Sequence, residues 1–110
     1  MQHKLRLHKE PFLLIKNWEK TIESRLLDEK RQKIKIWDEL IFISRESAEE
    51  IKTEVLKIYK EKDFEKLAKI IDLEKTWTKK VWDFLESLEL YYSKEKQKVF
   101  WVVALEFLNK

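Results

Sequence analysis

The chain has 110 residues, of which 44% are hydrophobic and 41% are charged, and 24 basic against 21 acidic residues leave a net charge of +3. This composition predicts one folded domain, residues 1–110, and excludes a disordered chain, which would carry far fewer large apolar residues. The small net charge argues against a basic coat for bulk polyanion binding. With no cysteine, and with His3 and His8 as the only histidines, we expect no disulfide, no metal site and no cofactor.

The apolar runs give no sign of a membrane or secretory segment. Met1 to Lys4 does not lead into the apolar core of a signal peptide. The longest apolar run, Val99 to Leu105, is too short to span a bilayer. We therefore expect a cytoplasmic protein with no membrane partner.

Glycine is absent from the sequence, although ordinary usage predicts about eight in a chain of this length. Its absence excludes P-loops and dinucleotide-binding fingerprints, which need glycine where the backbone approaches phosphate. Turns also use glycine for positive φ. Either the fold needs few turns, as a helical bundle does, or its turns are built from other residues.

In the N-terminal half, residues 3–8 alternate between apolar and polar side chains and predict a short strand. Apolar residues then recur at helical spacing and predict a helix over residues 10–18. Residues 20–27 alternate weakly and are predicted to be extended, and a charged connection follows at 28–33. The β-branched and aromatic run at 40–43 predicts a buried strand.

In the C-terminal half, residues 50–60 fit both a strand and a helix, and periodicity alone does not choose between them. Apolar stripes predict helices over 63–71 and 79–92, with one further helical turn at 93–97. Residues 99–108 alternate and predict a final strand. The mixed pattern predicts an α+β fold. The alternative, favoured by the absence of glycine, is a rearranged, mostly helical fold.

The segment from Asn17 to Arg25 resembles the signature of the ASCH domain family, Gly-x-Lys-x-x-Glu-x-Arg, which belongs to the PUA-like superfamily. Lys20, Glu23 and Arg25 match the signature, and Trp18 stands where the family has glycine. Other segments are similar to the family's opening strand and helix, its charged connection and its C-terminal part: His3–Leu7, Pro11–Phe12, Leu27–Lys35, Tyr91–Glu95 and Val102–Val103. The resemblance implies a small PUA-like β-barrel with about three helices.

The departures from the family pattern are systematic. Six residues stand where relatives have glycine: Trp18, Trp37, Trp77, Trp101, Ala48 and Ala104. Ordinary drift would scatter over serine, asparagine, aspartate and alanine, so the pattern indicates an engineered, glycine-free variant. A residue other than glycine costs roughly 1–2 kcal/mol in left-handed geometry. We therefore expect a very stable parent, unless several of these sites have ordinary φ or the local backbone has changed. The Lys/Glu-rich surface resembles thermophile composition and favours the stable parent.

Lys20, Glu23 and Arg25 are the first candidate site. On a strand, Glu23 and Arg25 share one face. An ammonium, a carboxylate and a guanidinium around one cleft bind a phosphate or a nucleobase edge, or orient a water for hydrolysis. By itself the pattern is more typical of a solvated strand edge with a surface ion pair. The family resemblance favours a ligand cleft.

The tryptophans are the second candidate feature. Trp18, Trp77 and Trp101, together with Trp37, fall at segment ends, where the loops of the family ring the cleft. One interpretation is an aromatic lining that stacks on a flat ligand or nucleobase, and a second is hydrophobic filler at turns. A third is an exposed patch for a protein partner or for self-association. Trp82 lies in a helical apolar stripe and is predicted to belong to the core.

Three functions remain open. The tryptophan pattern puts first an engineered ASCH-like scaffold whose cleft or loop surface is rebuilt to bind a ligand or partner. The second is a binding module for RNA or a modified nucleoside, with Lys20 and Arg25 on phosphate and tryptophan on the base. The third is implied by family members that deacetylate acetylcytidine: a small amidohydrolase acting on an acylated nucleoside, with Lys20 and Glu23 as catalytic residues. The downstream glutamate of that branch aligns near Glu74–Trp77. The expected partner is thus a small aromatic or nucleotide-like ligand, or RNA.

Overall fold

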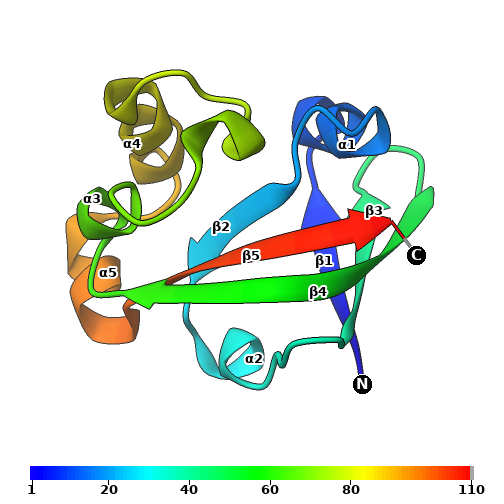
Figure 1. Ribbon diagram of the computed structural model, residues 1–110, viewed down its shortest axis with the longest axis horizontal. Helices are drawn as coiled ribbons and strands as arrows, with labels where there is room; N and C mark the ends of the chain where they lie inside the picture. Colours follow the sequence, from blue (N-terminus) through cyan, green and yellow to red (C-terminus); the bar gives the residue numbers. More distant parts are fainter. Residues whose placement is uncertain (110) are drawn as a thin grey trace.

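The fold is built on one mixed sheet of five strands with helices packed on both faces (Figure 1). The computed structural model describes residues 1–109, so that Lys110, the end of the predicted domain, lies outside this range. The strands are β1 (Gln2–Leu7), β2 (Ile22–Leu26), β3 (Glu39–Ser44), β4 (Glu50–Glu61) and β5 (Val102–Asn109). The helices are α1 (Lys9–Lys16), α2 (Glu29–Gln32), α3 (Phe64–Leu67), the 3-10 helix η1 (Leu73–Thr76), α4 (Val81–Glu89) and α5 (Lys94–Phe100). The predicted α+β class is confirmed, and the mostly helical alternative is wrong.

The strand order is β1-β3-β4-β5-β2, with β1 parallel to β3 and every other neighbouring pair antiparallel. The sheet curves into a half-barrel, so the predicted small barrel is open along one side (Figure 1). A register shift between Val55 and Lys57 interrupts the β4–β5 ladder, and such irregularities bend a strand. The two edge strands are β1 and β2. Within residues 1–109 no main-chain ladder joins them, and we call the gap between them the seam.

Two apolar clusters lie on opposite faces of the sheet. On one face, Phe12 and Ile15 of α1 pack against β1, β3, β4 and β5. On the other, Phe64 of α3 and Phe84 of α4 pack against β2 and β5. Alternate residues of β5 belong to alternate clusters, so the whole run Val102–Phe107 is buried. Burial on both faces explains why this strand is apolar at nearly every position.

Left-handed backbone occurs at five of the six positions where the family resemblance places glycine. The residues with positive φ among those described are Trp18 (61°), Trp37 (75°), Ala48 (61°), Trp77 (64°) and Trp101 (64°). Trp101 also has ψ −171°, a combination that almost only glycine populates. The possibility that several tryptophan sites have ordinary φ is therefore wrong. Ala104, paired with Ser24 in the β2–β5 ladder, does not have positive φ.

The helices were predicted in the right regions but with different bounds. Three short helices exceed the predicted number of about three: α2 lies within the charged connection 28–33, η1 follows α3, and α5 extends the predicted turn at 93–97. Asp28 caps α2 and Ser93 caps α5, each accepting a main-chain N–H of the first turn. The predicted helix 63–71 is α-helical only over α3. No helix in residues 1–109 has the length and apolar character needed to cross a bilayer.

Pairing between strands settles the ambiguous segment 50–60. It forms β4, because β3 pairs with it on one side and β5 on the other. Such pairing partners lie far away in the sequence, and local periodicity does not reveal them.

Two predictions for the C-terminal half were wrong. The last strand begins at Val102 and not at residue 99, because α5 runs on to Phe100 and the reversed φ of Trp101 ends it. Trp82 is not core: its side chain is 73% exposed. The buried residue of α4 is Phe84, which turns toward the second cluster and leaves the first turn of the helix outside.

Candidate functional site

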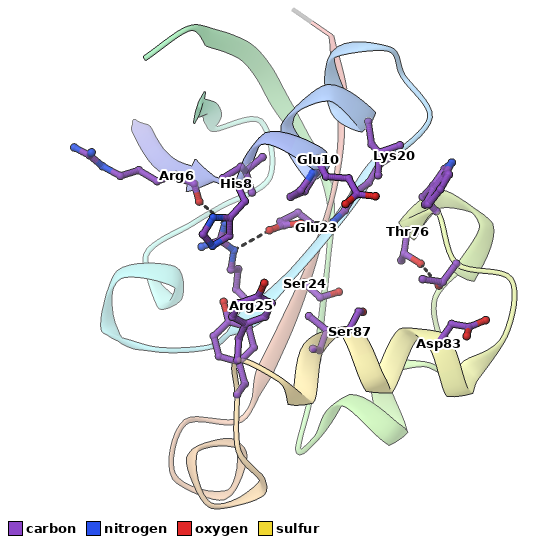
Figure 2. Close-up of a pocket in the computed structure, with 18 of the residues that line it drawn as sticks. Arg6, His8, Glu10, Lys20, Glu23, Ser24, Arg25, Thr76, Asp83 and Ser87 are labelled. Atoms are coloured by element: carbon purple, nitrogen blue, oxygen red, sulfur yellow. Dashed lines mark hydrogen bonds and ion pairs between the residues drawn. The ribbon is translucent and has the colours of Figure 1, made fainter. Parts of the chain in front are cut away.

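A cavity of about 1200 Å³ opens beside the edge strand β2, at the seam (Figure 2). Its walls come from β1, α1, β2, residues 73–79, which comprise η1 and the turn after it and which we call the η1 loop, α4 and the segment after α4. Five cationic and four acidic side chains line it: Arg6, Lys20, Arg25, Arg45, Lys79, Glu10, Glu23, Glu74 and Asp83. Its rings are His8, Trp77, Tyr91 and Tyr92. A cavity of this size with rings and a few convergent polar groups suits a flat organic ligand.

Lys20, Glu23 and Arg25 meet in this cavity as one ion-paired group, which we call the triad (Figure 2). Lys20 Nζ lies 2.7 Å from Glu23 Oε1, and Arg25 Nε donates to Glu23 Oε2 at 2.8 Å. Arg25 Nη2 also donates to the main-chain oxygen of Arg6 at 3.0 Å. The side chain of Arg25 therefore links β2 to β1 across the seam.

The ion pairs of the triad fix the charges of Glu23 and Arg25. Burial alone would raise the pKa of Glu23, but the charges of Lys20 and Arg25 and their hydrogen bonds outweigh it and hold that pKa below its usual value. Burial alone would lower the pKa of Arg25, but the Glu23 carboxylate and Tyr92 outweigh it and raise that pKa. Glu23 is thus a carboxylate at neutral pH, with a cation on each oxygen.

The turn after α1 brings Lys20 to Glu23. Trp18 has positive φ and reverses the chain beyond α1. The N–H groups of Glu19 and Lys20 then both donate to the main-chain oxygen of Leu14, at 2.9 and 3.1 Å. This places Lys20 just before β2. Alternation along β2 puts Glu23 and Arg25 on the same face.

The η1 loop forms the facing wall and is anchored to the sheet at its base. The N–H of Thr21 donates to the main-chain oxygen of Lys75 at 2.8 Å, and Lys75 Nζ donates to Glu106 Oε2 at 3.0 Å. Beyond the anchor, Thr76 Oγ1 lies 2.6 Å from the hydroxyl of Thr78 (Figure 2). Trp77 lies between these threonines, and its half-exposed indole lines the cavity.

The structure brings together four of the six residues that we expected to bind ligand: Lys20, Glu23, Arg25 and Trp77. Trp18 and Trp101 do not line this cavity. Trp18 closes α1, and the ring of Trp101 lies under Lys62, with Nζ 5.9 Å from the ring centroid. Trp37 is also outside the cavity, so the loop tryptophans do not converge.

Several lining residues had not been expected at the ligand site from the sequence. His8 and Tyr91 stack with ring centroids 6.0 Å apart, which joins the end of β1 to the segment after α4. Arg45 reaches the cavity because its N–H continues the parallel β1–β3 ladder to the main-chain oxygen of Leu7 at 2.9 Å. No local sequence pattern predicts the contact of His8 with Tyr91 or that of Arg45 with Leu7. The Tyr91–Glu95 similarity to the family is the one signal that pointed to this wall.

No cluster of three or more histidine, cysteine, aspartate or glutamate side chains is placed to hold an ion within residues 1–109.

Comparison with known proteins identifies the family. The model of the ASCH domain matches residues 5–110. The chain belongs to the ASCH domain family. The crystal structure of hypothetical protein PH0355 is similar to this ASCH domain with a TM-score of 0.87 and 30% identity, covering 100% of both chains. The solution NMR structure of protein PF0455 from Pyrococcus furiosus is similar with a TM-score of 0.72 and 30% identity, covering 99% of this chain and 97% of that one. No curated protein matches this ASCH domain.

Proposed function

We propose that this ASCH domain binds a nucleotide unit of RNA, or a modified nucleoside, in the cavity beside β2. The observation that carries the proposal is the buried triad in a cavity that also contains aromatic rings. A base needs a flat surface to stack on and polar groups at its edge, and a phosphate needs unpaired cations. The cavity offers all three.

The phosphate would lie at the rim of the cavity. Lys20 and Arg25 are committed to Glu23, which leaves them one net positive charge between them. Arg6, Arg45 and Lys79 are exposed and have no ion-pair partner within residues 1–109. These three rim cations are therefore the better phosphate ligands. The triad orders the cavity and holds the seam.

The base would lie between the η1 loop and the rings on the other side. The indole of Trp77 is half exposed at the cavity, and the stacked pair of His8 and Tyr91 forms a second flat surface. Stacking on an aromatic side chain contributes about 1–3 kcal/mol per base and tolerates any base.

Titration with a short single-stranded RNA tests the proposal. We expect Arg45→Ala and Lys79→Ala to weaken binding and to lower its salt dependence, by roughly 0.7 in the slope of log K against log salt for each lost phosphate contact. The matched control is Lys57→Ala, an exposed lysine of β4 outside the cavity, which should bind as the unchanged chain does. Binding that is insensitive to salt, or an equal loss in the control, would contradict the rim assignment.

Hydrolysis of an acylated nucleoside is the second candidate, favoured by one observation. Glu74 lines the same cavity as Lys20, and it lies in the segment Glu74–Trp77, near which the glutamate of the hydrolytic branch of the family aligns. Lys20 Nζ is held 2.7 Å from a carboxylate, which suits an ammonium that anchors a carbonyl and not an amine that attacks it. Incubation with N4-acetylcytidine, followed by separation of the products, tests this function. Cytidine release that is abolished in both Lys20→Ala and Glu74→Gln would put it first.

We also infer that the chain is an engineered, glycine-free variant. The support is that four tryptophans and Ala48 occupy left-handed backbone, where glycine is the ordinary residue. Three of the four tryptophans lie outside the cavity, which favours a change made throughout the chain over a cleft rebuilt for one ligand. An exposed patch for self-association remains part of this hypothesis, and analytical ultracentrifugation of the purified chain tests it. A monomer at all concentrations would remove it.

A further inference from the structure

Ser24 carries a hydroxyl that has no partner within residues 1–109. Its side chain is only 5% exposed, and its buried Oγ makes no hydrogen bond to the described part of the chain. Ser24 nevertheless lines the cavity from β2, opposite Ser87 of α4 (Figure 2). The hydroxyl of Ser87 already donates to the main-chain oxygen of Phe84 at 2.8 Å. A buried hydroxyl without a partner is costly to the fold, and such groups are rare.

The main chain of Ser24 also points into the seam. Hydrogen bonds to β5 bracket β2 at Thr21, which accepts from Phe107, and at Leu27, which donates to the main-chain oxygen of Trp101. Main-chain groups alternate in direction along an antiparallel strand. Those of Glu23 and Arg25 therefore face β5, and the N–H and C=O of Ser24 face away from it. Within residues 1–109 no strand pairs with that side of β2.

The polar side chains that β2 contributes to the cavity lie on both faces of the strand. Glu23 and Arg25 lie on one face and are already bonded to each other. Ser24 lies on the opposite face, with Ile22 and Leu26, which pack on the second cluster. Ser24 thus presents an N–H donor, a C=O acceptor and a hydroxyl, all at the open edge of one strand.

This combination discriminates between the parts of a nucleotide. A phosphate has only acceptor oxygens, so it would match the N–H and the hydroxyl but would be repelled by the carbonyl. The edge of a nucleobase carries a donor beside an acceptor, which matches the adjacent C=O and N–H of one extended residue. The edge of β2 therefore suits a base and not a phosphate.

We propose that Ser24 is the specificity-determining residue of the cavity, and that its main chain and hydroxyl hydrogen-bond the edge of the nucleobase. The proposal rests on the nucleotide-binding function proposed above. The base lies along the open edge of β2, and the rim cations hold the phosphate outside it. The hydroxyl that the free protein leaves unpaired gains its partner when the base enters.

Two variants with equally buried serines test the proposal. Ser24→Ala removes the unpaired hydroxyl, so we expect an unchanged or higher Tm and a binding constant about three- to tenfold weaker for a nucleoside monophosphate. Ser44 is also 5% exposed, but its Oγ accepts from the N–H groups of Glu46 and Ser47 and lies outside the cavity. Ser44→Ala should therefore lower Tm and leave the affinity unchanged.

The probes are the four ribonucleoside 5′-monophosphates, with ribose 5-phosphate as the base-free probe. They are titrated into the unchanged ¹⁵N-labelled chain and followed by amide chemical shifts. We expect the monophosphates to shift the Ser24 amide and ribose 5-phosphate to leave it in place. If the monophosphates bind but the Ser24 amide stays in place, or Ser24→Ala binds equally well, this inference is overturned and nucleotide binding stands. If no monophosphate shifts any amide of the cavity, both proposals fail.

Discussion

Replacing Trp101 by glycine and, separately, by alanine measures the strain of its backbone. The residue has φ 64° and ψ −171°, and a residue with a Cβ costs about 1–3 kcal/mol in sparsely populated geometry of this kind. The indole is 46% exposed, so its buried half, of order 100 Å², contributes about 2–3 kcal/mol. The loss of the indole therefore nearly cancels the relief of strain when Trp101→Gly is compared with the unchanged chain. Comparing the glycine variant with the alanine variant cancels the contribution of the indole, because both variants lose it.

Glycine should be the more stable of the two replacements. Glycine relieves the backbone strain of about 1–3 kcal/mol that alanine keeps. This gain is reduced by about 0.5–1 kcal/mol, because glycine loses more conformational freedom on folding. We expect the free energy of unfolding of Trp101→Gly to be about 0.5–2 kcal/mol higher than that of Trp101→Ala, and its Tm to be about 2–8 °C higher. Urea and thermal unfolding measure the two differences. Val99, exposed on α5 and without positive φ, is the matched control. There glycine should be less stable than alanine by about 1 kcal/mol. A Trp101→Ala variant at least as stable as Trp101→Gly would refute the strain argument.

The other predictions concern the triad and α4. Arg25→Lys keeps a cation for Glu23 but cannot also reach the main-chain oxygen of Arg6, so it should unfold at a Tm between those of the unchanged chain and Arg25→Ala; a lysine variant as stable as the unchanged chain would show that the link across the seam adds nothing. Folding lowers the pKa of Glu23, so its carboxylate stabilises the fold above its ordinary pKa, and this contribution is lost as the pH falls through the folded-state value. Glu23→Gln should therefore be about 3 kcal/mol less stable at pH 7, with a deficit that shrinks in acid; a deficit that stays constant down to pH 3 would contradict the direction of the shift. Trp82→Ala should cost under 1 kcal/mol in urea unfolding and Phe84→Ala about 3–5, because only Phe84 is buried; equal losses would return Trp82 to the core.

The triad could be predicted from the sequence because its three residues are close together in the chain. Lys20, Glu23 and Arg25 are close in sequence, and one turn followed by a strand brings them together. The left-handed sites were also predictable, since the family pattern marks glycine wherever the chain must reverse. Ala104 was the exception among them, because a residue in a buried ladder beside Ser24 needs no positive φ.

Contacts with elements that are distant in the sequence determined the features that local patterns did not predict. The segment 50–60 became a strand because β3 and β5 lie on both sides of it. Trp82 was assigned to the wrong side of α4, since an apolar stripe at the first turn of a short helix does not say which of its residues faces the core. Arg45 reached the cavity through a parallel pairing with β1 that no nearby residue signals.

The seam lets β2 both link the two edges of the sheet and offer the groups that we propose for ligand binding. If β1 and β2 formed a main-chain ladder, the N–H and C=O of Ser24 would be used in it and the cavity would have no polar edge. Arg25 joins the two strands by its side chain instead, and the distance that a guanidinium spans leaves the main chain beside it unpaired. Glu23 makes this possible, because its carboxylate holds Arg25 in place while Lys20 occupies its other oxygen. Lys20, Glu23 and Arg25 therefore hold the two edge strands together by side-chain contacts. Ser24, between two of them, keeps its main chain free for the ligand contact proposed above.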